Sequence, residues 1–293
     1  ESGRNPKFIE RIYSQSTDAI VESVNGMEEA TVEATVLDVG VEGLAISDSR
    51  VPYIFNDDVP VVRFVNAQSG ETISTMLSLA QHPETLWSDN PYLTSDYPHY
   101  VRKHIEEGLD AVEDSEGSEV KPALPGLGGV TLFFAGSVGG LINPGKGGAL
   151  NYADEPPAEK FSFETAEAVG QRLASHVLSA WENGEADSIT ETEVSFARKE
   201  FMIPIENRVF QMAAFQFGLL ERDVYNAVRK GSNDYVPDFP EALSEAAVIR
   251  LGPITFFTAP GELFSETLTG GFPGKPSART PVIEIGRASC RAR

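Results

Sequence analysis

Residues 61–79 read VVRFVNAQSGETISTMLSL, and this stretch contains the pattern that decides the fold. Two runs of mainly β-branched and apolar residues, Val61–Val65 and Thr72–Leu79, flank a polar turn that contains Gly70. Such a pattern is typical of a β-hairpin. Thr31–Val39 alternates apolar and polar residues, which predicts a further, half-buried strand. The sequence therefore predicts a sheet that is built around this hairpin.

Helical patterns are interspersed with these strands. The clearest helix covers Phe161–Trp181, with Ser, Thr and Glu residues at its start and Asn183-Gly184 as a stop signal at its end. No internal repeat and no Pro/Ser linker divides the sequence. Because helices and strands intermix along one chain, we predict an α/β fold, a layered domain with a mixed central β-sheet flanked by helices. We expect residues 1–286 to form this single domain.

The two ends of the sequence carry further signals. Residues 287–293 contain three arginines in a chain that is otherwise acidic, so we expect them to be a non-native tail outside the fold. The chain starts at Glu1 without a basic and then apolar leader, so no signal peptide is expected within it.

The composition excludes several classes of partner and site. The net charge is −21, from 44 acidic and 23 basic residues. Such a surface repels phosphate backbones and anionic lipid, so we expect no nucleic-acid partner. No apolar run of about 18 residues occurs, so no transmembrane segment is predicted. Because the only cysteine is Cys290, a metal would be held by histidine, carboxylate or other oxygen ligands.

A histidine stands directly after the second strand of the hairpin, in the sequence Ala80-Gln81-His82-Pro83. Strand ends are where α/β folds place ligands and reacting groups, and an imidazole suits zinc. The alternative is that His82 caps the strand end through a backbone hydrogen bond.

A carboxylate occupies a similar position much later in the chain. The short apolar strand Ile254–Thr258 ends in Ala259-Pro260-Gly261-Glu262. Glu262 is either a metal ligand or a negative charge at the start of a helix over Leu263–Leu268, where the helix dipole favours it.

The glycine-rich stretch Gly136–Gly148 follows an apolar strand and admits three interpretations. Its segment Gly140–Gly147 nearly fits the phosphate-binding pattern GxxxxGK[ST]. However, Gly147 stands where a hydroxyl is required, and no helix follows.

The second interpretation is a nucleophile elbow around Ser137, but Gly139-Gly140 and Pro144 oppose the helix that this motif requires. The third is a loop whose backbone N–H groups approach a ligand or a metal-bound substrate closely. We favour the third interpretation.

Taken in order, these segments resemble the N-terminal catalytic domain of the neutral/alkaline non-lysosomal ceramidases. The resemblance rests on His82-Pro83 followed by Asn90 and Ser95-Asp96, on the strand and glycine loop from Phe133 to Pro144, and on Pro260-Gly261-Glu262. It covers nearly all of residues 5–286.

This resemblance implies that His82 and Glu262 are zinc ligands. The family has a further zinc histidine upstream, in a His-x-His stretch, and a zinc tyrosine downstream, and neither is present in this sequence. The resemblance therefore implies that this sequence holds about half of a metal shell.

The resemblance also implies roles for three other residues. Asn143 stands where the family has a serine with a catalytic role, and an asparagine donates hydrogen bonds to an oxyanion but is no hydroxyl nucleophile. Gly139 belongs to the glycine loop, whose backbone N–H groups would assist Asn143 in stabilising the oxyanion. Asp96 would orient His82 or accept a proton.

The predicted function is a zinc-dependent hydrolase that cleaves an amide bond of an N-acyl, ceramide-like substrate, or an ester bond, through metal-activated water. The substrate would be a small or lipid-like molecule of sphingolipid type, and the resemblance implies a secreted or periplasmic location. Two alternatives stand beside it. One is a catalytically inactive binding module with the ceramidase fold, and the other is a serine hydrolase that uses Ser137.

Overall fold

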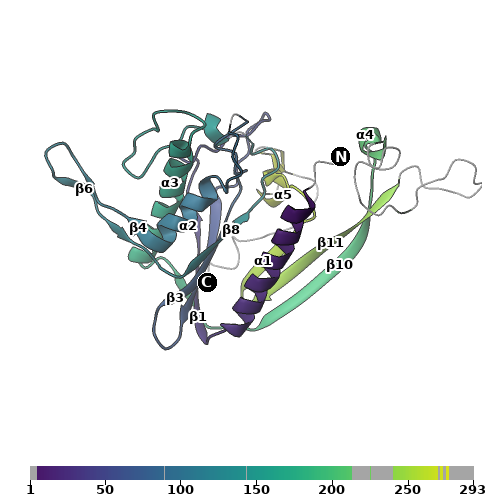
Figure 1. The fold of residues 1–293 in the computed structure, drawn as a ribbon, viewed down its shortest axis with the longest axis horizontal. Coiled ribbons are helices and arrows are strands. Elements are labelled where there is room, and N and C mark those ends of the chain that lie inside the picture. Colours follow the sequence, from purple (N-terminus) through teal and green to yellow (C-terminus); the bar gives the residue numbers. More distant parts are fainter. Residues whose placement is uncertain are drawn as a thin grey trace, which may run out of the picture. The chain divides into compact units, whose positions relative to one another are not determined.

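The predicted hairpin lies in a five-stranded sheet. The computed structural model describes residues 5–88, 90–142, 144–212, 225, 240–269, 271–272 and 275–276. The sheet has the strand order β8-β3-β2-β1-β9. Its strands are β1 (Ala30–Asp38), β2 (Asp58–Asn66), β3 (Thr72–Leu79), β8 (Val130–Ala135) and β9 (Asp187–Ile189) (Figure 1).

This sheet is mixed, as predicted. The strand pairs β1–β2, β2–β3 and β1–β9 are antiparallel, whereas β3 and β8 run parallel, with Leu79 opposite Ala135. The hairpin turn between β2 and β3 is closed by the Asn66 side chain, which accepts hydrogen bonds from the N–H groups of Gln68 and Ser69.

Two helices, α2 (Tyr97–Glu107) and α3 (Phe163–Glu182), pack against each other and against this sheet (Figure 1). One hydrophobic cluster joins the three elements. It includes Val59, Val61, Leu77 and Leu79 of the sheet, Tyr97, Val101 and Ile105 of α2, and Val169, Leu173 and Val177 of α3. The predicted layered α/β fold is therefore confirmed.

The predicted helix α3 begins where its capping signal lies. Ser162 accepts a hydrogen bond from the N–H of Thr165, at 3.1 Å, and Glu164 lies in the first turn. Gly170 lets α3 approach α2 closely, because a side chain there would collide with Tyr100.

The chain divides into two compact units. The first comprises Glu1–Glu28, Phe196–Ile249 and Phe256–Pro260, and the second comprises Glu29–Ser195, Arg250–Thr255 and Gly261–Arg293. The single domain expected over residues 1–286 stays a prediction, and residues 287–293 lie outside the described part.

The first unit holds α1 (Pro6–Asn25), α4 (Arg208–Gln211) and most of a second sheet with the order β10-β11-β12. These strands are β10 (Val194–Pro204), β11 (Glu241–Leu251) and β12 (Ile254–Thr258).

The other elements of the second unit are short. They are β4 (Gly108–Leu109), β5 (Val112–Glu113), β6 (Glu119–Lys121), β7 (Leu124–Pro125), the 3-10 helix η1 (Pro144–Lys146), α5 (Ser265–Thr269), β13 (Gly271–Phe272) and β14 (Lys275–Pro276). Strand β4 pairs with β7, β5 with β6, and β13 with β14. Within the described residues, no helix combines the length and hydrophobicity that a membrane crossing requires.

Candidate active site

His82 and Glu262, which are far apart in the sequence, meet in the second unit. The Nε2 atom of His82 lies 3.4 Å from Oε2 of Glu262. The imidazole is largely buried, with 18% of its side chain exposed, whereas the Glu262 side chain is 61% exposed. The pair therefore has a buried nitrogen donor on one side and a solvent-accessible carboxylate on the other.

The geometry of this pair differs from that of a hydrogen bond. His82 Nε2 is buried and has no hydrogen-bond partner within the described residues. Two donor atoms that share a tetrahedral zinc, each about 2.1 Å from the metal, lie about 3.4 Å apart. The pair thus has the donor chemistry and the separation of two zinc ligands. Within the described residues, however, no group of three or more His, Cys, Asp or Glu side chains is arranged to hold a metal.

The sheet explains why the His82 loop and the glycine loop are neighbours. Parallel strands end at the same edge of a sheet, so the chain leaves β3 and β8 side by side. Gly136 donates its N–H to the carbonyl of Leu79 at 2.9 Å, and His82 donates its backbone N–H to Leu141 at 3.2 Å. The two loops are therefore tied together by their backbones.

Asp96 braces the loop that follows His82. It is the N-cap of α2, is 6% exposed and has φ +56°. Its carboxylate accepts hydrogen bonds from the N–H groups of Thr85 (3.1 Å), Leu86 (3.0 Å) and Tyr97 (2.7 Å), and from the Thr85 hydroxyl. Both oxygens are thus engaged within the loop and helix, and a direct role of Asp96 toward His82 stays a prediction.

The segment that follows Glu262 is tied to the glycine loop. Gly139 donates its N–H to the carbonyl of Leu263 at 2.8 Å, and the Ser265 hydroxyl donates to the carbonyl of Ser137 at 3.3 Å. Gly139 also forms a parallel β-bridge with Phe264. The hydrogen bond from the Gly139 N–H to Leu263 thus helps to hold the segment that carries Glu262 in place. The role predicted for Gly139 in stabilising an oxyanion stays a prediction.

Arg50 joins three segments around the site. Its guanidinium donates to both oxygens of Glu266, at 2.7 and 3.1 Å, and to Oδ1 of the buried Asp48 at 3.3 Å. It also lies over the ring of Phe264, 4.3 Å from the centroid. The hydrogen bonds from Arg50 hold the pKa of Glu266 below its usual value. They also raise the pKa of Arg50 itself.

Asp48 completes this connection, because its carboxylate also accepts hydrogen bonds from the N–H groups of Arg50 (2.9 Å) and Ile54 (3.0 Å). Neither Asp48 nor Glu266 was identified from the sequence. No local pattern in the sequence indicates the partners of Arg50, because tertiary contacts set them.

Ser137 is buried, with 2% of its surface exposed. Its hydroxyl accepts a hydrogen bond from Asn56 Nδ2 at 3.3 Å and lies 3.5 Å from the hydroxyl of Ser265. Within the described part of the chain, its hydrogen-bond partners include no histidine. Asn143, the other residue predicted in this loop, lies outside the described residues.

Comparison with solved structures identifies a shared fold. The neutral ceramidase from Pseudomonas aeruginosa aligns with a TM-score of 0.53 and 13% sequence identity, over 84% of this chain and 43% of that chain. A structure described as ceramidase complexed with C2 aligns with a TM-score of 0.47 and 14% identity, over 80% and 42% of the two chains. No family model and no curated protein matches the sequence. The first alignment confirms the predicted resemblance at the level of the fold, and the chain spans less than half of that ceramidase.

Proposed function

From the neutral-ceramidase fold of this chain, we propose that the protein is a zinc-dependent hydrolase. It cleaves an amide bond of an N-acyl, ceramide-like molecule, or an ester bond, by attack of a water on the carbonyl carbon. The observation that carries the proposal is the 3.4 Å separation between His82 Nε2 and Glu262 Oε2.

His82 and Glu262 would hold the metal, with two further donors to complete a tetrahedral set. When bound, zinc polarises a carbonyl and lowers the pKa of a coordinated water towards neutrality. Support for the site comes from His82 Nε2, which is buried and has no hydrogen-bond partner among the described residues, and which a metal would satisfy.

The chain's own residues hold these two ligands in place. Asp96 fixes the loop after His82, and Gly139 and Arg50 fix the segment that follows Glu262. The exposed carboxylate of Glu262 faces solvent, so water has access to the site. Asn143 is proposed as the donor that stabilises the oxyanion.

The test is zinc binding by a version of the protein extended to include the two further donors, measured by calorimetric titration for the unsubstituted protein, His82→Ala and Glu262→Gln. We expect both substitutions to abolish or strongly weaken binding, because each removes one of the two ligands. His99→Ala removes an exposed histidine and serves as the matched control. Unchanged zinc affinity in His82→Ala would contradict the proposed site.

A second candidate function is a binding module that has this fold without catalysis. Two observations favour it, namely Asn143 in place of a hydroxyl residue and the engagement of the Gly139 N–H with Leu263. Zinc-dependent turnover of fluorogenic N-acyl and acyl-ester substrates separates the two functions. Turnover that disappears in Glu262→Gln supports the hydrolase, and zinc binding without turnover supports the binding module.

The serine-hydrolase alternative has a separate test. Because the Ser137 hydroxyl is buried and paired with Asn56, we expect no labelling of Ser137 by a fluorophosphonate probe. Labelling that is lost in Ser137→Ala would instead support a serine mechanism.

A further inference from the structure

The peptide group that joins Gln81 to His82 is held on both of its edges. The carbonyl of Gln81 accepts a hydrogen bond from the hydroxyl of Tyr97 at 2.8 Å, and the N–H of His82 donates to the carbonyl of Leu141 at 3.2 Å. Because a peptide group is planar, two hydrogen bonds on its opposite edges restrain the plane from rotating. The orientation of the main chain where it enters His82 is therefore fixed.

These hydrogen bonds matter because His82 lies beyond the sheet. Strand β3 ends at Leu79, so His82 is outside the hydrogen-bonded ladder that orients the strand residues. On its other side, Pro83 disfavours helical backbone angles at His82 and favours extended ones. The two hydrogen bonds thus fix how the chain enters the histidine, and the proline limits how it leaves. Together these constraints restrict the directions in which the Cα–Cβ bond of His82 can point.

Tyr97 is itself held firmly. It is the first residue of α2, and its N–H donates a hydrogen bond to the Asp96 carboxylate at 2.7 Å. The residue is fully buried, and its ring meets that of Phe133 edge-on, with the two centroids 5.6 Å apart. A closely packed core side chain has little freedom to move with a loop, so the Tyr97 hydroxyl is a fixed point for the Gln81 carbonyl.

The side chain of Gln81 adds a third contact. Gln81 is fully buried, and its Nε2 donates a hydrogen bond to the carbonyl of Leu44 at 3.0 Å. This contact keeps Gln81 against the core, where its own carbonyl stays within reach of Tyr97.

The Tyr97 hydroxyl also stays a donor over a wide pH range. Burial raises the pKa of Tyr97 well above its usual value, and the neighbouring Asp96 carboxylate raises it further. The phenol is therefore protonated, and able to donate its hydrogen bond, at neutral and moderately alkaline pH.

We propose that Tyr97 is a positioning residue for the candidate active site, and that its hydroxyl orients His82 toward Glu262 through the Gln81 carbonyl. This role differs from that of Asp96, which braces the residues that follow His82. The importance of Tyr97 for metal binding rests on the proposed zinc-dependent function, whereas the orientation of His82 is a property of the metal-free chain.

Nuclear Overhauser contacts in the metal-free chain test this orientation. The wild type should show contacts between the ring protons of His82 and the side chain of Glu262, because Nε2 and Oε2 of the two residues are 3.4 Å apart. The variant His82→Gln identifies the ring resonances. In Tyr97→Phe, which removes only the hydroxyl, we expect the contacts to weaken severalfold, because the peptide group before His82 is then free on one edge.

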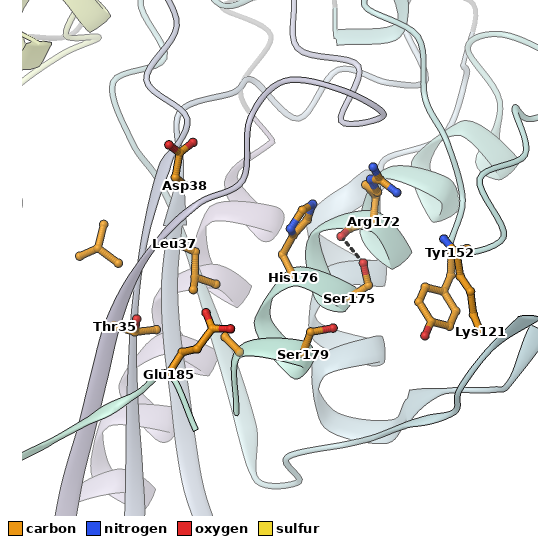
Figure 2. A pocket seen from close by; sticks show the side chains of 12 residues that line it. Thr35, Leu37, Asp38, Lys121, Tyr152, Arg172, Ser175, His176, Ser179 and Glu185 are labelled. Atoms are coloured by element: carbon orange, nitrogen blue, oxygen red, sulfur yellow. Dashed lines mark hydrogen bonds between the residues drawn. The ribbon is translucent and has the colours of Figure 1, made fainter. Parts of the chain in front are cut away.

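Tyr152→Phe is the matched control. The Tyr152 hydroxyl also donates to a backbone carbonyl, that of Pro122, at 2.7 Å. Tyr152 lines the pocket between α3 and β1 that Figure 2 shows, beside Lys121, and no residue that lines this pocket belongs to the His82–Glu262 pair. We expect the contacts between His82 and Glu262 to stay unchanged in this variant.

Val177→Ala controls for a general loss of stability, because Val177 is a fully buried core residue of α3. It should lower the urea midpoint at least as much as Tyr97→Phe, and leave the contacts between His82 and Glu262 in place. Equal weakening of these contacts in Val177→Ala and Tyr97→Phe would overturn the proposal, since a looser fold would then explain the effect. Unchanged contacts in Tyr97→Phe would overturn it as well.

Zinc affinity is the second readout, in the version of the protein that is extended to include the two further donors. Tyr97→Phe should weaken zinc binding about tenfold, as is typical for groups that orient a metal ligand, and Tyr152→Phe should leave it unchanged. Equal affinities of Tyr97→Phe and the unsubstituted protein would overturn the positioning role. If the unsubstituted protein binds no zinc, the proposed function fails, and the contacts in the metal-free chain still decide whether Tyr97 orients His82.

Discussion

The guanidinium of Arg50 pairs with both carboxylate oxygens of Glu266, with Nη1–Oε1 at 2.7 Å and Nη2–Oε2 at 3.1 Å. Glu266 lies in α5, four residues after Glu262 in the sequence. A two-point pair fixes orientation as well as distance, so Arg50 holds the segment that presents Glu262 to His82.

Replacement of Arg50 by lysine should break this arrangement, because an ammonium cannot pair with both oxygens of Glu266 in the same plane. We expect Arg50→Lys to lower the free energy of unfolding by about 1–2 kcal/mol. It should also weaken zinc binding. Urea denaturation and calorimetric titration measure the two effects.

The matched control is Arg198→Lys in the first unit. Arg198 pairs with Glu245 at 3.0 Å, but both side chains are about half exposed, at 58% and 44%. Its loss should cost about 0–1 kcal/mol and leave zinc affinity unchanged. Equal effects of the two substitutions on zinc affinity would contradict the positioning role of Arg50.

The Arg50–Glu266 pair also predicts a pH dependence. The hydrogen bonds from Arg50 hold the pKa of Glu266 below its usual value of 4.5 in the folded chain. A carboxyl with a lowered folded pKa stabilises the fold above its unfolded pKa, and this contribution is lost as pH falls through the folded pKa. The wild type should therefore be more stable than Glu266→Gln near neutral pH, and the difference should shrink in acid.

Urea midpoints of the two proteins, measured from about pH 7 to about pH 3, check this expectation. A stability difference that stays constant over the whole range would show that ionisation of Glu266 does not contribute.

Asp96 should matter for both stability and the site, because it caps α2 and braces the loop of His82. We expect Asp96→Ala to cost about 2–4 kcal/mol, since it removes an N-cap and leaves several buried donors without a partner. Zinc affinity should fall with it. Ser162→Ala removes the N-cap of α3 and should cost about 1 kcal/mol without a change in zinc affinity. If both variants bind zinc like the wild type, Asp96 has a purely structural role.

Two glycines allow the close contact beneath Arg50 to be tested. Gly140 and Gly148 have similar backbone angles, with φ +86° and +79°. A Cβ atom at Gly140 would lie 2.5 Å from Nε of Arg50, whereas nothing lies within 4 Å of one at Gly148. Gly148→Ala should therefore cost only the backbone strain, about 1 kcal/mol. Gly140→Ala should cost about 1–3 kcal/mol more and weaken zinc binding. Indistinguishable urea midpoints of the two variants would be the contrary result.

The parts of the fold that follow from local patterns could be predicted from the sequence. The alternation in Thr31–Val39 and the runs around Gly70 gave β1, β2 and β3, and capping residues gave α3. The meeting of His82 and Glu262 was expected from the ceramidase resemblance, because no local pattern links two residues so far apart.

Other contacts carry no signal in a single sequence. Asp48 and Glu266 are polar residues without periodicity, and only the folded chain brings them to Arg50. The engagement of the Gly139 N–H depends on the position of Leu263, which the glycine loop itself does not encode.

The parallel pairing of β3 with β8 has a consequence for how this site can vary. Leu79 and Ala135 are opposite each other, so the chain departs from both strands at the same level. Insertions or deletions further along either loop would alter what it presents while its point of departure stays fixed. Strand direction thus fixes where the His82 loop and the glycine loop begin, and variation within either loop is confined to the positions beyond their shared hydrogen bonds.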